Sequence, residues 1–297
     1  MADIIFPNLN ITIQNLDPVA FRIFGFGIYW YAIFVVLGIA AGVYFGAFFA
    51  PKKTGQDPKL YENFAYWVIP FAILGGRLFY VIFADWTPSR FIDIFNLRLG
   101  GIGIWGVIIA AFVTAIIYCR RKKISFLNFA DTAVVGLIIG HVIGRFGNFT
   151  NREAFGGFAS DSAPFAMQVR LDQVRMTLDP ANYYHSEIIE NIITRSGIQY
   201  IQVHPVFFYE AFINLLLFIF LNLYRKYKKF NGELIAMYFL SYGITRFVLE
   251  SMRTDQLLIG NTNIAVAHVL SGTAALGAAA FLGYGYFKHF KNSKKAA

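Results

Sequence analysis

The feature that most constrains this chain is a series of long apolar runs, separated from one another by short polar or basic segments. A helix needs about 20 residues to cross the hydrocarbon core of a bilayer, and runs of this length favour membrane spans. The predicted spans are residues 26–50, 61–83, 101–119, 129–149, 206–224, 234–252 and 264–287. The sequence therefore predicts an all-α polytopic membrane protein with about seven transmembrane helices, built as a single membrane-embedded domain over residues 1–297.

Composition and charge placement agree with this class and predict an orientation. Apolar residues make up 57% of the chain and charged residues only 14%, which is typical of a polytopic membrane protein. All the lysines lie in the loops at 51–60, 120–123 and 225–229 and in the C-terminal tail. Because basic residues gather on the cytoplasmic side, the N-terminus is predicted outside and the C-terminus in the cytoplasm. The net charge of +9 then reflects topology beside an anionic lipid surface, and no nucleic-acid partner is expected.

Two segments outside the spans have mixed polar and apolar character. Residues 1–26 could form a short interfacial segment. Residues 150–204 are the long hydrophilic stretch between the fourth and fifth spans, and residues 165–170 alternate in a way that favours a strand. The orientation above places this stretch on the outer side, where we predict a small head insertion that caps a cavity and guides a peptide substrate.

Polar and ionisable side chains gather where the fourth span ends. On a helix Arg145 and Asn148 would share a face, and Asn151 and Glu153 follow just outside the span. A charge at that depth costs free energy unless it is paired or functional. A structural helix end with Arg145 paired to a carboxylate is the simpler alternative, and a functional site is the one that intramembrane charges favour. Gly147, like Gly144, leaves the backbone open to close approach by another helix or a ligand.

Other spans also carry polar residues near their outer ends. Tyr31 opens the first span, where an aromatic-belt role is the simpler alternative. His204 precedes the fifth span, and Glu210 lies inside that span and needs a partner. Arg246 and Glu250 are four residues apart on the sixth span, so they could neutralise each other.

The embedded arginines suggest an anionic ligand. Arg77, Arg145 and Arg246 stand against Glu210 and Glu250, although Arg77 could be a structural partner of either glutamate. A guanidinium binds phosphate through paired hydrogen bonds, so an excess of arginine favours a phospholipid or another anionic amphiphile. The residues alone thus indicate an outward-facing enzyme, or a carrier or flippase for such a molecule. A scaffold protein with a folded outer domain is a third alternative, which leaves the arginines unexplained.

The sequence carries no signature of a metal or cofactor site. The single cysteine, Cys119, excludes an internal disulfide and a cysteine-based metal cluster. Metal-ligand spacing, a phosphate-binding loop, a serine–histidine–aspartate order and a dinucleotide fingerprint are all absent from the sequence. We therefore expect neither a metal nor a cofactor.

Residues 144–156, GRFGNFTNREAFG, resemble the signature of the bacterial prolipoprotein diacylglyceryl transferase family. The resemblance extends over nearly the whole chain, and the seven-span topology of that family, with its outer-side active site, agrees with the orientation predicted above. The other segments that fall in the family's order are Tyr29-Trp30-Tyr31, Gly75-Gly76-Arg77-Leu78, Gly100-Gly101-Ile102, His204-Pro205 through Glu210, and Tyr242-Gly243 through Glu250.

The resemblance implies a reaction and a location. The diacylglyceryl group of phosphatidylglycerol is transferred to the thiol of the lipobox cysteine of a prolipoprotein, which releases glycerol phosphate and begins lipoprotein maturation. The expected partners are therefore phosphatidylglycerol, lipobox peptides and the bilayer. The implied location is the bacterial cytoplasmic (inner) membrane, with several spans and an active site towards the outer face. The substrate supplies the thiol nucleophile, so Cys119 is not needed.

The same resemblance implies roles for individual residues. Arg145 and Arg246 would bind the phosphate and stabilise the charge that develops on the leaving group. The predicted catalytic residues are Arg145, Arg246, Tyr31, Asn148, Glu153 and His268. The predicted substrate-binding residues are Arg145, Arg246, Gly156, Asn151, His204, Glu250 and Arg77.

The chain departs from the family pattern in ways that leave the general base open. Trp105 stands where the family often has histidine or tyrosine, and Val107 stands in place of a glycine. An indole only donates hydrogen bonds, so it cannot act as a base. In the seventh span His268 takes the place of a glutamine. The alternatives are His268, Tyr31, Glu153 or unassisted attack by a thiolate in an arginine-rich field, and the chain could also be a divergent, inactive paralogue.

Overall fold

The computed structural model describes residues 2–83, 91–96, 101–174, 176–180, 182–260 and 262–296. It divides into two compact units. The larger unit comprises Met1–Gly42 and Leu137–Ala297, and the smaller unit comprises Val43–Gly136. The predicted single domain over residues 1–297 stays a prediction, and each unit is described by itself below.

Six helices in the described ranges are long and apolar enough to cross a membrane. They run over Trp30–Thr54, Pro58–Phe83, Ile104–Lys122, Phe126–Asn151, Val206–Tyr227 and Val266–Lys294. Helix α8 (Glu233–Glu250) is not among them, because its 18 residues include Glu233, Arg246 and Glu250. The predicted polytopic helical class is confirmed, while the count of seven spans stays a prediction.

The smaller unit is built around a close helix pair. It contains the π-helix η2 (Tyr44–Phe49), α2 (Ala50–Thr54), α3 (Pro58–Phe83), the 3₁₀-helix η3 (Phe91–Phe95), α4 (Ile104–Lys122) and the start of α5. Glycines allow α3 and α4 to approach each other, since a Cβ on Gly106 would collide with the carbonyl oxygen of Gly75. The N–H of Gly103 also donates to the carbonyl of Gly76 at 2.9 Å. Small residues thus join two apolar helices where a hydrophobic driving force is weak.

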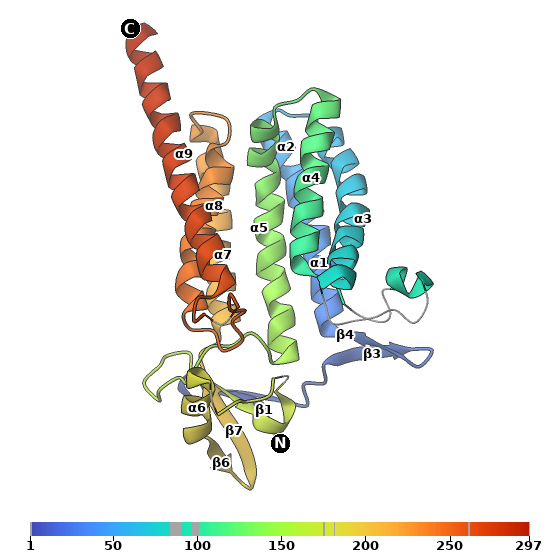
Figure 1. The fold of residues 1–297 in the computed structure, drawn as a ribbon, viewed down its shortest axis with the longest axis vertical. Coiled ribbons are helices and arrows are strands. Elements are labelled where there is room, and N and C mark those ends of the chain that lie inside the picture. The colour runs from blue at the N-terminus through green and yellow to red at the C-terminus, as the bar shows by residue number, and fades with distance from the viewer. Residues whose placement is uncertain are drawn as a thin grey trace. The chain divides into compact units, whose positions relative to one another are not determined.

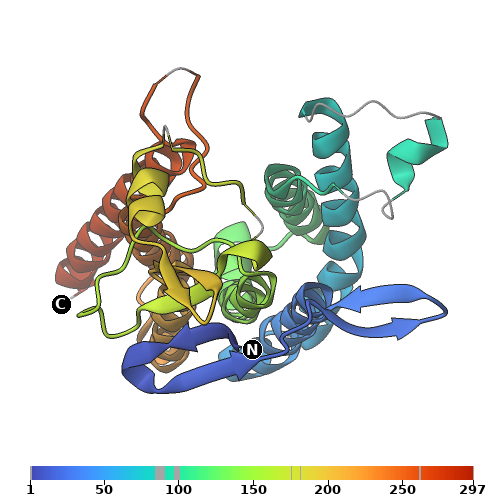
Figure 2. The ribbon, with the colours of Figure 1, turned by 90° about the horizontal axis from the view of Figure 1, so that it is seen from below.

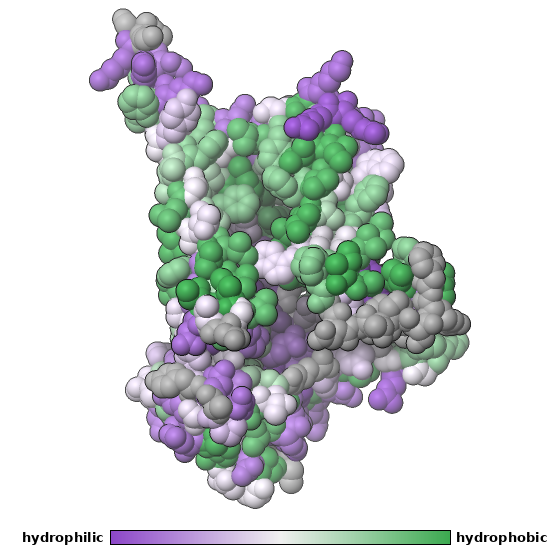
Figure 3. Space-filling model, in the orientation of Figure 1, coloured by the Kyte–Doolittle hydropathy of each residue, from purple (hydrophilic) through white to green (hydrophobic). Residues whose placement is uncertain are grey.

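The helices of the larger unit form a bundle. They are α1 (Trp30–Val43), the later part of α5 (Phe126–Asn151), α7 (Val206–Tyr224), α8 and α9 (Val266–Ala296), shown in Figure 1. Helices α1 and α5 approach closely, because a Cβ on Gly38 would lie 3.1 Å from the carbonyl oxygen of Gly140. Figure 3 shows hydrophobic side chains over much of the helical part, whereas hydrophilic side chains gather on the end of α9 and on the part outside the bundle.

A small sheet at one end of this bundle forms what we call the head. Its strand order is β2-β1-β5-β7-β6, with α6 (Tyr183–Glu190) beside it, and Figure 2 views the molecule from this end. The strands are β1 (Ala2–Phe6), β2 (Ile11–Gln14), β5 (Met167–Arg170), β6 (Ile193–Arg195) and β7 (Ile198–Val203). Ile4, Met167 and Ile201 pack in its core with Phe155.

The strands of the head were only partly expected from the sequence. The chain is not purely α-helical outside its spans, and the strand expected within residues 165–170 is confirmed as β5. Strands β1 and β2 belong to the head, because β1 pairs with β5 from the predicted head segment, whereas the interfacial position expected for residues 1–26 stays a prediction. A second small sheet, β3 (Val19–Ile23) with β4 (Phe26–Tyr29), leads directly into α1.

A buried carboxylate, that of Glu233, links three helices of the bundle at the end away from the head. Glu233 accepts hydrogen bonds from the hydroxyls of Tyr224 and Tyr286, each at 2.6 Å. It also accepts from the backbone N–H of Lys229 at 2.5 Å. These bonds connect α7, α8 and α9 at this end of the bundle.

Candidate active site

Three helices of the larger unit each bring one charged side chain to a common point near the head. Arg145 of α5 lies with Nη2 2.5 Å from Oε1 of Glu210 on α7. Arg246 of α8 lies with Nη1 3.5 Å from Oε2 of the same carboxylate. The Glu210 side chain is 1% exposed, whereas those of Arg145 and Arg246 are 20% and 19% exposed. Two guanidinium groups therefore share one buried carboxylate and both remain accessible to a ligand. We call these three residues the arginine cluster.

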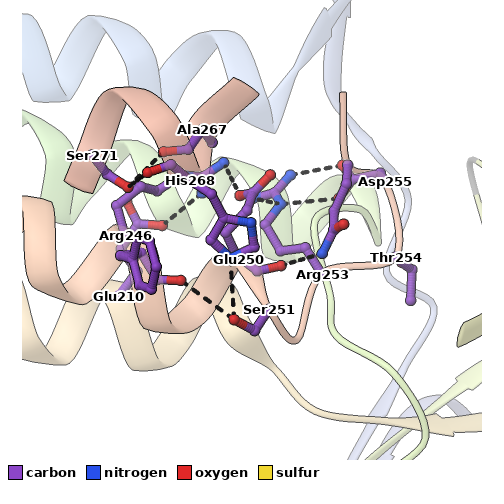
Figure 4. A network of polar contacts seen from close by, with 12 residues as sticks. Glu210, Arg246, Glu250, Ser251, Arg253, Thr254, Asp255, Ala267, His268 and Ser271 are labelled. Atoms are coloured by element: carbon purple, nitrogen blue, oxygen red, sulfur yellow. Dashed lines mark hydrogen bonds and ion pairs between the residues drawn. The ribbon is translucent and has the colours of Figure 1, made fainter. Parts of the chain in front are cut away.

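Further acidic and basic groups continue the cluster along α8, as Figure 4 shows. Arg246 Nη2 lies 2.6 Å from Glu250 Oε2, and Arg253 Nε lies 3.8 Å from the same oxygen. Arg253 in turn donates to both oxygens of Asp255, at 3.0 and 2.7 Å. Each arginine here has a carboxylate partner, so the predicted excess of arginine is wrong for this group of residues.

What the cluster offers an anion is hydrogen-bond capacity. A guanidinium carries five N–H donors, more than the carboxylates use here. Arg246 Nη1 is buried and donates no hydrogen bond to any residue in the described part of the chain. Arg145 Nη1 has a weak acceptor, Asn148 Oδ1, at 3.3 Å. The two guanidinium groups therefore retain donor capacity beyond what their carboxylate partners use.

The next polar groups lie on the last turn of α5 and in residues 152–156 after it, which we call the signature loop. Asn148 and Asn151 both donate from Nδ2 to Glu153 Oε1, at 3.1 and 3.2 Å. Together with the bond from Arg145 to Asn148, this makes a continuous chain from the cluster to Glu153. The backbone turns sharply here, because Arg152 and Ala154 both have left-handed conformations with φ of 53° and 58°. The structure therefore brings four of the predicted residues together.

Tyr31 joins this group from α1. Its ring lies against Gly147 of α5, where an added Cβ would be 2.7 Å from Tyr31 Cδ2. The close approach predicted for Gly147 is thus confirmed, while Gly144 has nothing within 4 Å of its Cβ position. Tyr31 is 39% exposed, so its ring is both held and accessible.

Gly156 and His204 connect the signature loop to the head and to α8. The N–H of Gly156 donates to the carbonyl of His204 at 2.8 Å, and a Cβ there would lie 2.9 Å from the carbonyl oxygen of Met252. His204 Nδ1 lies 3.3 Å from the hydroxyl of Tyr209, and burial lowers the pKa of the His204 ring. Both residues shape the loop, and their predicted roles in substrate binding stay predictions.

His268 lies at the start of α9 beside the end of α8. Its Nε2 is 3.1 Å from Ser251 Oγ, and its ring meets the ring of Phe247 edge to face at 4.9 Å. Figure 4 shows the imidazole and its contact with Ser251. The predicted catalytic role of His268 stays a prediction, and its described partner is a serine.

Arg77 belongs to the smaller unit, and its guanidinium donates to backbone carbonyls. The residue is 1% exposed and donates to the carbonyls of Asp93, Ile94 and Gly101 at 2.9, 2.7 and 3.1 Å. These bonds tie α3 to the segments before α4. Glu210 and Glu250 take their partners from α5, α8 and the segment after α8, so Arg77 has a structural role here and its predicted role in binding stays a prediction. Trp105 lies in the first turn of α4 and is half-buried.

Sequence reasoning missed Tyr242, which contacts the cluster, and His141, which packs on Tyr242, and it understated Glu210. Glu210, expected only to need a partner, is the centre of the cluster. Tyr242 donates from its hydroxyl to Glu210 Oε1 at 3.3 Å, and its ring centroid lies 5.3 Å from that of His141. The available signal was helical spacing, since Tyr242 and His141 each precede a cluster arginine by four residues on the same face. Among the described residues, no group of three or more histidine, cysteine or acidic side chains is placed to hold a metal ion.

Comparison with known proteins identifies the family of this chain. The model of the prolipoprotein diacylglyceryl transferase family matches residues 18–284. The chain belongs to this family. That assignment confirms the predicted resemblance, and it makes the chain a membrane-embedded transferase of lipoprotein biosynthesis. Every residue of the cluster and of the signature loop lies within the matched range.

Individual relatives support the assignment over most of the chain. A protein of Finegoldia magna is 34% identical over 263 residues, which cover 86% of this chain and 93% of the relative. A protein of Shouchella clausii is 35% identical over 260 residues, covering 87% and 86%. One of Clostridioides difficile is 33% identical over 282 residues, covering 94% and 97%. All three are named phosphatidylglycerol–prolipoprotein diacylglyceryl transferase.

Proposed function

We propose that this chain transfers the diacylglyceryl group of phosphatidylglycerol to the thiol of a prolipoprotein lipobox cysteine, and that the arginine cluster binds the lipid phosphate. The observation that carries the site is the sharing of Glu210 by Arg145 and Arg246, with both guanidinium groups still partly exposed. Family membership supports the reaction itself.

The chemistry asks for stabilisation of negative charge. The thiol loses its proton, its sulfur bonds to the terminal carbon of the diacylglyceryl group, and the bond from that carbon to the phosphate oxygen breaks. The electron pair leaves with glycerol phosphate, which gains a negative charge. The reference pKa of a thiol is about 8.5, so the thiol must lose its proton before or during the attack. A fixed donor aimed at developing charge contributes about 2.7–4 kcal/mol in enzymes where one has been removed.

Glu210 gives the cluster its preorganisation. The carboxylate is buried and touches both arginines, so their guanidinium groups are held before a substrate arrives. The chain from Arg145 through Asn148 to Glu153 fixes the first arginine, and Glu250 fixes the second. Little rearrangement is then needed when the phosphate binds.

We place this site at the outer face of the bacterial cytoplasmic membrane, with α8 as the remaining span. Within the larger unit the head follows α5 and precedes α7, while the lysine-rich segments lie at the far ends of α7 and α9 (Figure 1). Basic residues favour the cytoplasmic side, which leaves the head and the cluster outside. The lipobox peptide then arrives from the head side and phosphatidylglycerol from the outer leaflet.

A transfer assay tests the proposal. The purified protein is placed in nanodiscs containing phosphatidylglycerol with a lipobox peptide, and mass spectrometry follows the thioether lipopeptide and glycerol phosphate. Product from the parent and a large loss in Arg246→Ala support the proposal, with the exposed Arg22→Ala as the matched control. Binding of the lipid without any product would favour a carrier, and full activity in Arg246→Ala would remove the cluster from the mechanism.

A further inference from the structure

A buried amide on α7 has no hydrogen-bond partner. Asn214 is 1% exposed, and neither its Nδ2 nor its Oδ1 makes a hydrogen bond to any residue that the structure describes. A buried polar group left unsatisfied costs free energy comparable to that of a lost hydrogen bond, and this side chain has two such groups. Deep in a membrane span the cost is larger still, so a neutral hydrogen-bonding ligand is expected at this amide.

A second unsatisfied atom lies one helical turn away on the same face. Glu210 precedes Asn214 by four residues, and both belong to the buried stripe of α7. Glu210 Oε2 is buried and accepts no hydrogen bond within the described ranges, although Arg246 Nη1 lies 3.5 Å away as an ion pair. Side chains at this spacing have Cβ atoms about 5–6 Å apart, a separation that one water molecule bridges.

The neighbouring helices supply polar groups at the same depth. His141 lies one turn before Arg145 on α5, and Tyr238 lies one turn before Tyr242 on α8. The Tyr238 hydroxyl is 3.4 Å from His141 Nδ1. By helical spacing Asn214, His141 and Tyr238 each lie one turn further from the head than Glu210, Arg145 and Tyr242 on their own helices. A buried water needs two to four polar partners, and the unsatisfied groups of Asn214 together with Glu210 Oε2 are enough for one.

We propose that Asn214 is a positioning residue that holds a buried water molecule, and that this water donates a hydrogen bond to Glu210 Oε2. The water satisfies the carboxylate oxygen that would otherwise draw closer to Arg246. The Arg246 guanidinium thus keeps its position, with its exposed part available to the lipid phosphate. The part of this inference that concerns phosphate rests on the proposed function, whereas the water site itself does not.

The affinity for phosphatidylglycerol measures the effect of Asn214 on Arg246. In Asn214→Leu, which has similar volume and cannot hold the water, Glu210 closes on Arg246 and the Kd for phosphatidylglycerol rises roughly tenfold. Asn214→Ser retains a hydroxyl and room for water, so it restores most of the affinity. Thermal unfolding in the same nanodiscs shows that each variant is folded, and the serine variant keeps the test open if Asn214→Leu does not fold.

A double-mutant cycle separates positioning from a merely structural role. If Asn214 acts through Arg246, then Asn214→Leu has little further effect on the Kd once Arg246→Ala is present. A structural role would give the same fold-change in both backgrounds, and this result would overturn the proposal. An unchanged Kd in Asn214→Leu would also overturn it.

A high-resolution structure of the parent in nanodiscs tests the water directly. Density between the Asn214 amide and Glu210 Oε2, lost in Asn214→Leu, is the expected result. An Asn214 amide bonded directly to Glu210 or His141 would contradict the proposal. Because this observation needs no turnover, its failure is distinct from a failure of the parent in the transfer assay.

Discussion

Arg77 and Arg246 are both arginines embedded in apolar helices, yet they use their hydrogen-bond donors differently. Arg77 donates to three backbone carbonyls and is 1% exposed. Arg246 is held by the carboxylates of Glu210 and Glu250, is 19% exposed, and keeps Nη1 without a hydrogen bond among the residues described. The first arginine stabilises backbone structure, and the second is the one that we propose binds an anion. Unused donors and residual exposure, rather than burial, distinguish the two.

The largest effect is expected from the cluster itself. Arg145→Ala and Arg246→Ala should each lower kcat/KM by roughly 10²–10³-fold, because each removes fixed donors aimed at the leaving phosphate. Arg246→Lys should fall between these variants and the parent, since a lysine keeps the charge but loses the planar fork. The transfer assay measures this series. Equal activity in the lysine variant and the parent would mean that charge alone suffices.

Arg77 should behave in the opposite way. Arg77→Met leaves three carbonyl oxygens without their donor, so stability should fall by about 2–3 kcal/mol. The measurement is the midpoint of thermal unfolding, together with kcat/KM per folded molecule. Activity per folded molecule should change less than threefold or so, because the donors serve the backbone. A stable Arg77→Met protein that has lost affinity for phosphatidylglycerol would place Arg77 in the binding site after all.

A smaller effect is expected at the contact between α1 and α5. Gly147→Ala forces a Cβ to within 2.7 Å of Tyr31 Cδ2, so the ring must move. Overpacking of this kind typically costs about 1–3 kcal/mol, and kcat should fall with it if Tyr31 contributes to the site. Gly144→Ala is the matched control on the same helix, because nothing lies within 4 Å of its Cβ position. Equal unfolding midpoints for the two variants would contradict the contact.

His268 is expected to matter less than the cluster. Its Nε2 contacts Ser251 at 3.1 Å and its ring rests on Phe247, so it orders the end of α8. His268→Gln should therefore lower kcat by less than about tenfold, the scale of one ordinary hydrogen bond. Ser251→Ala should give a similar value. A loss larger than hundredfold or so, with an altered pH profile of kcat, would instead identify His268 as the general base.

The smallest effect concerns the pH dependence of stability. Burial lowers the pKa of His204, so the folded protein favours the neutral ring. As the pH falls through about 6.5, the unfolded chain takes up the proton first and stability decreases. The unfolding midpoint of the parent should therefore drop on acidification, and His204→Gln should show a smaller drop. Because the ring is half-exposed, solvent screens most of the effect. An identical pH dependence in both proteins would remove His204 from this account.

Some of the structure could be predicted from the sequence because its signals are local. The apolar runs predicted the long helices, the alternation at residues 165–170 predicted β5, and Gly147 was expected to admit a neighbour. The shared face of Arg145 and Asn148 also follows from helical spacing, and the two side chains are 3.3 Å apart.

Other features depend on pairings between distant segments. No local pattern shows that β1 pairs with β5, more than 150 residues later, or that Glu210 lies between arginines from two other helices. The same limit explains Arg77. Its sequence context resembles that of a binding residue, and only the three carbonyls around its guanidinium reveal the structural role.

Equilibrium binding of phosphatidylglycerol tests the central claim most directly. The parent, Arg246→Ala and Arg77→Met are compared in nanodiscs of neutral lipid into which phosphatidylglycerol is titrated. The account predicts a roughly hundredfold weaker Kd in Arg246→Ala and an unchanged Kd for the folded fraction of Arg77→Met. Unaltered binding in Arg246→Ala would contradict the claim that the arginine cluster holds the phosphate.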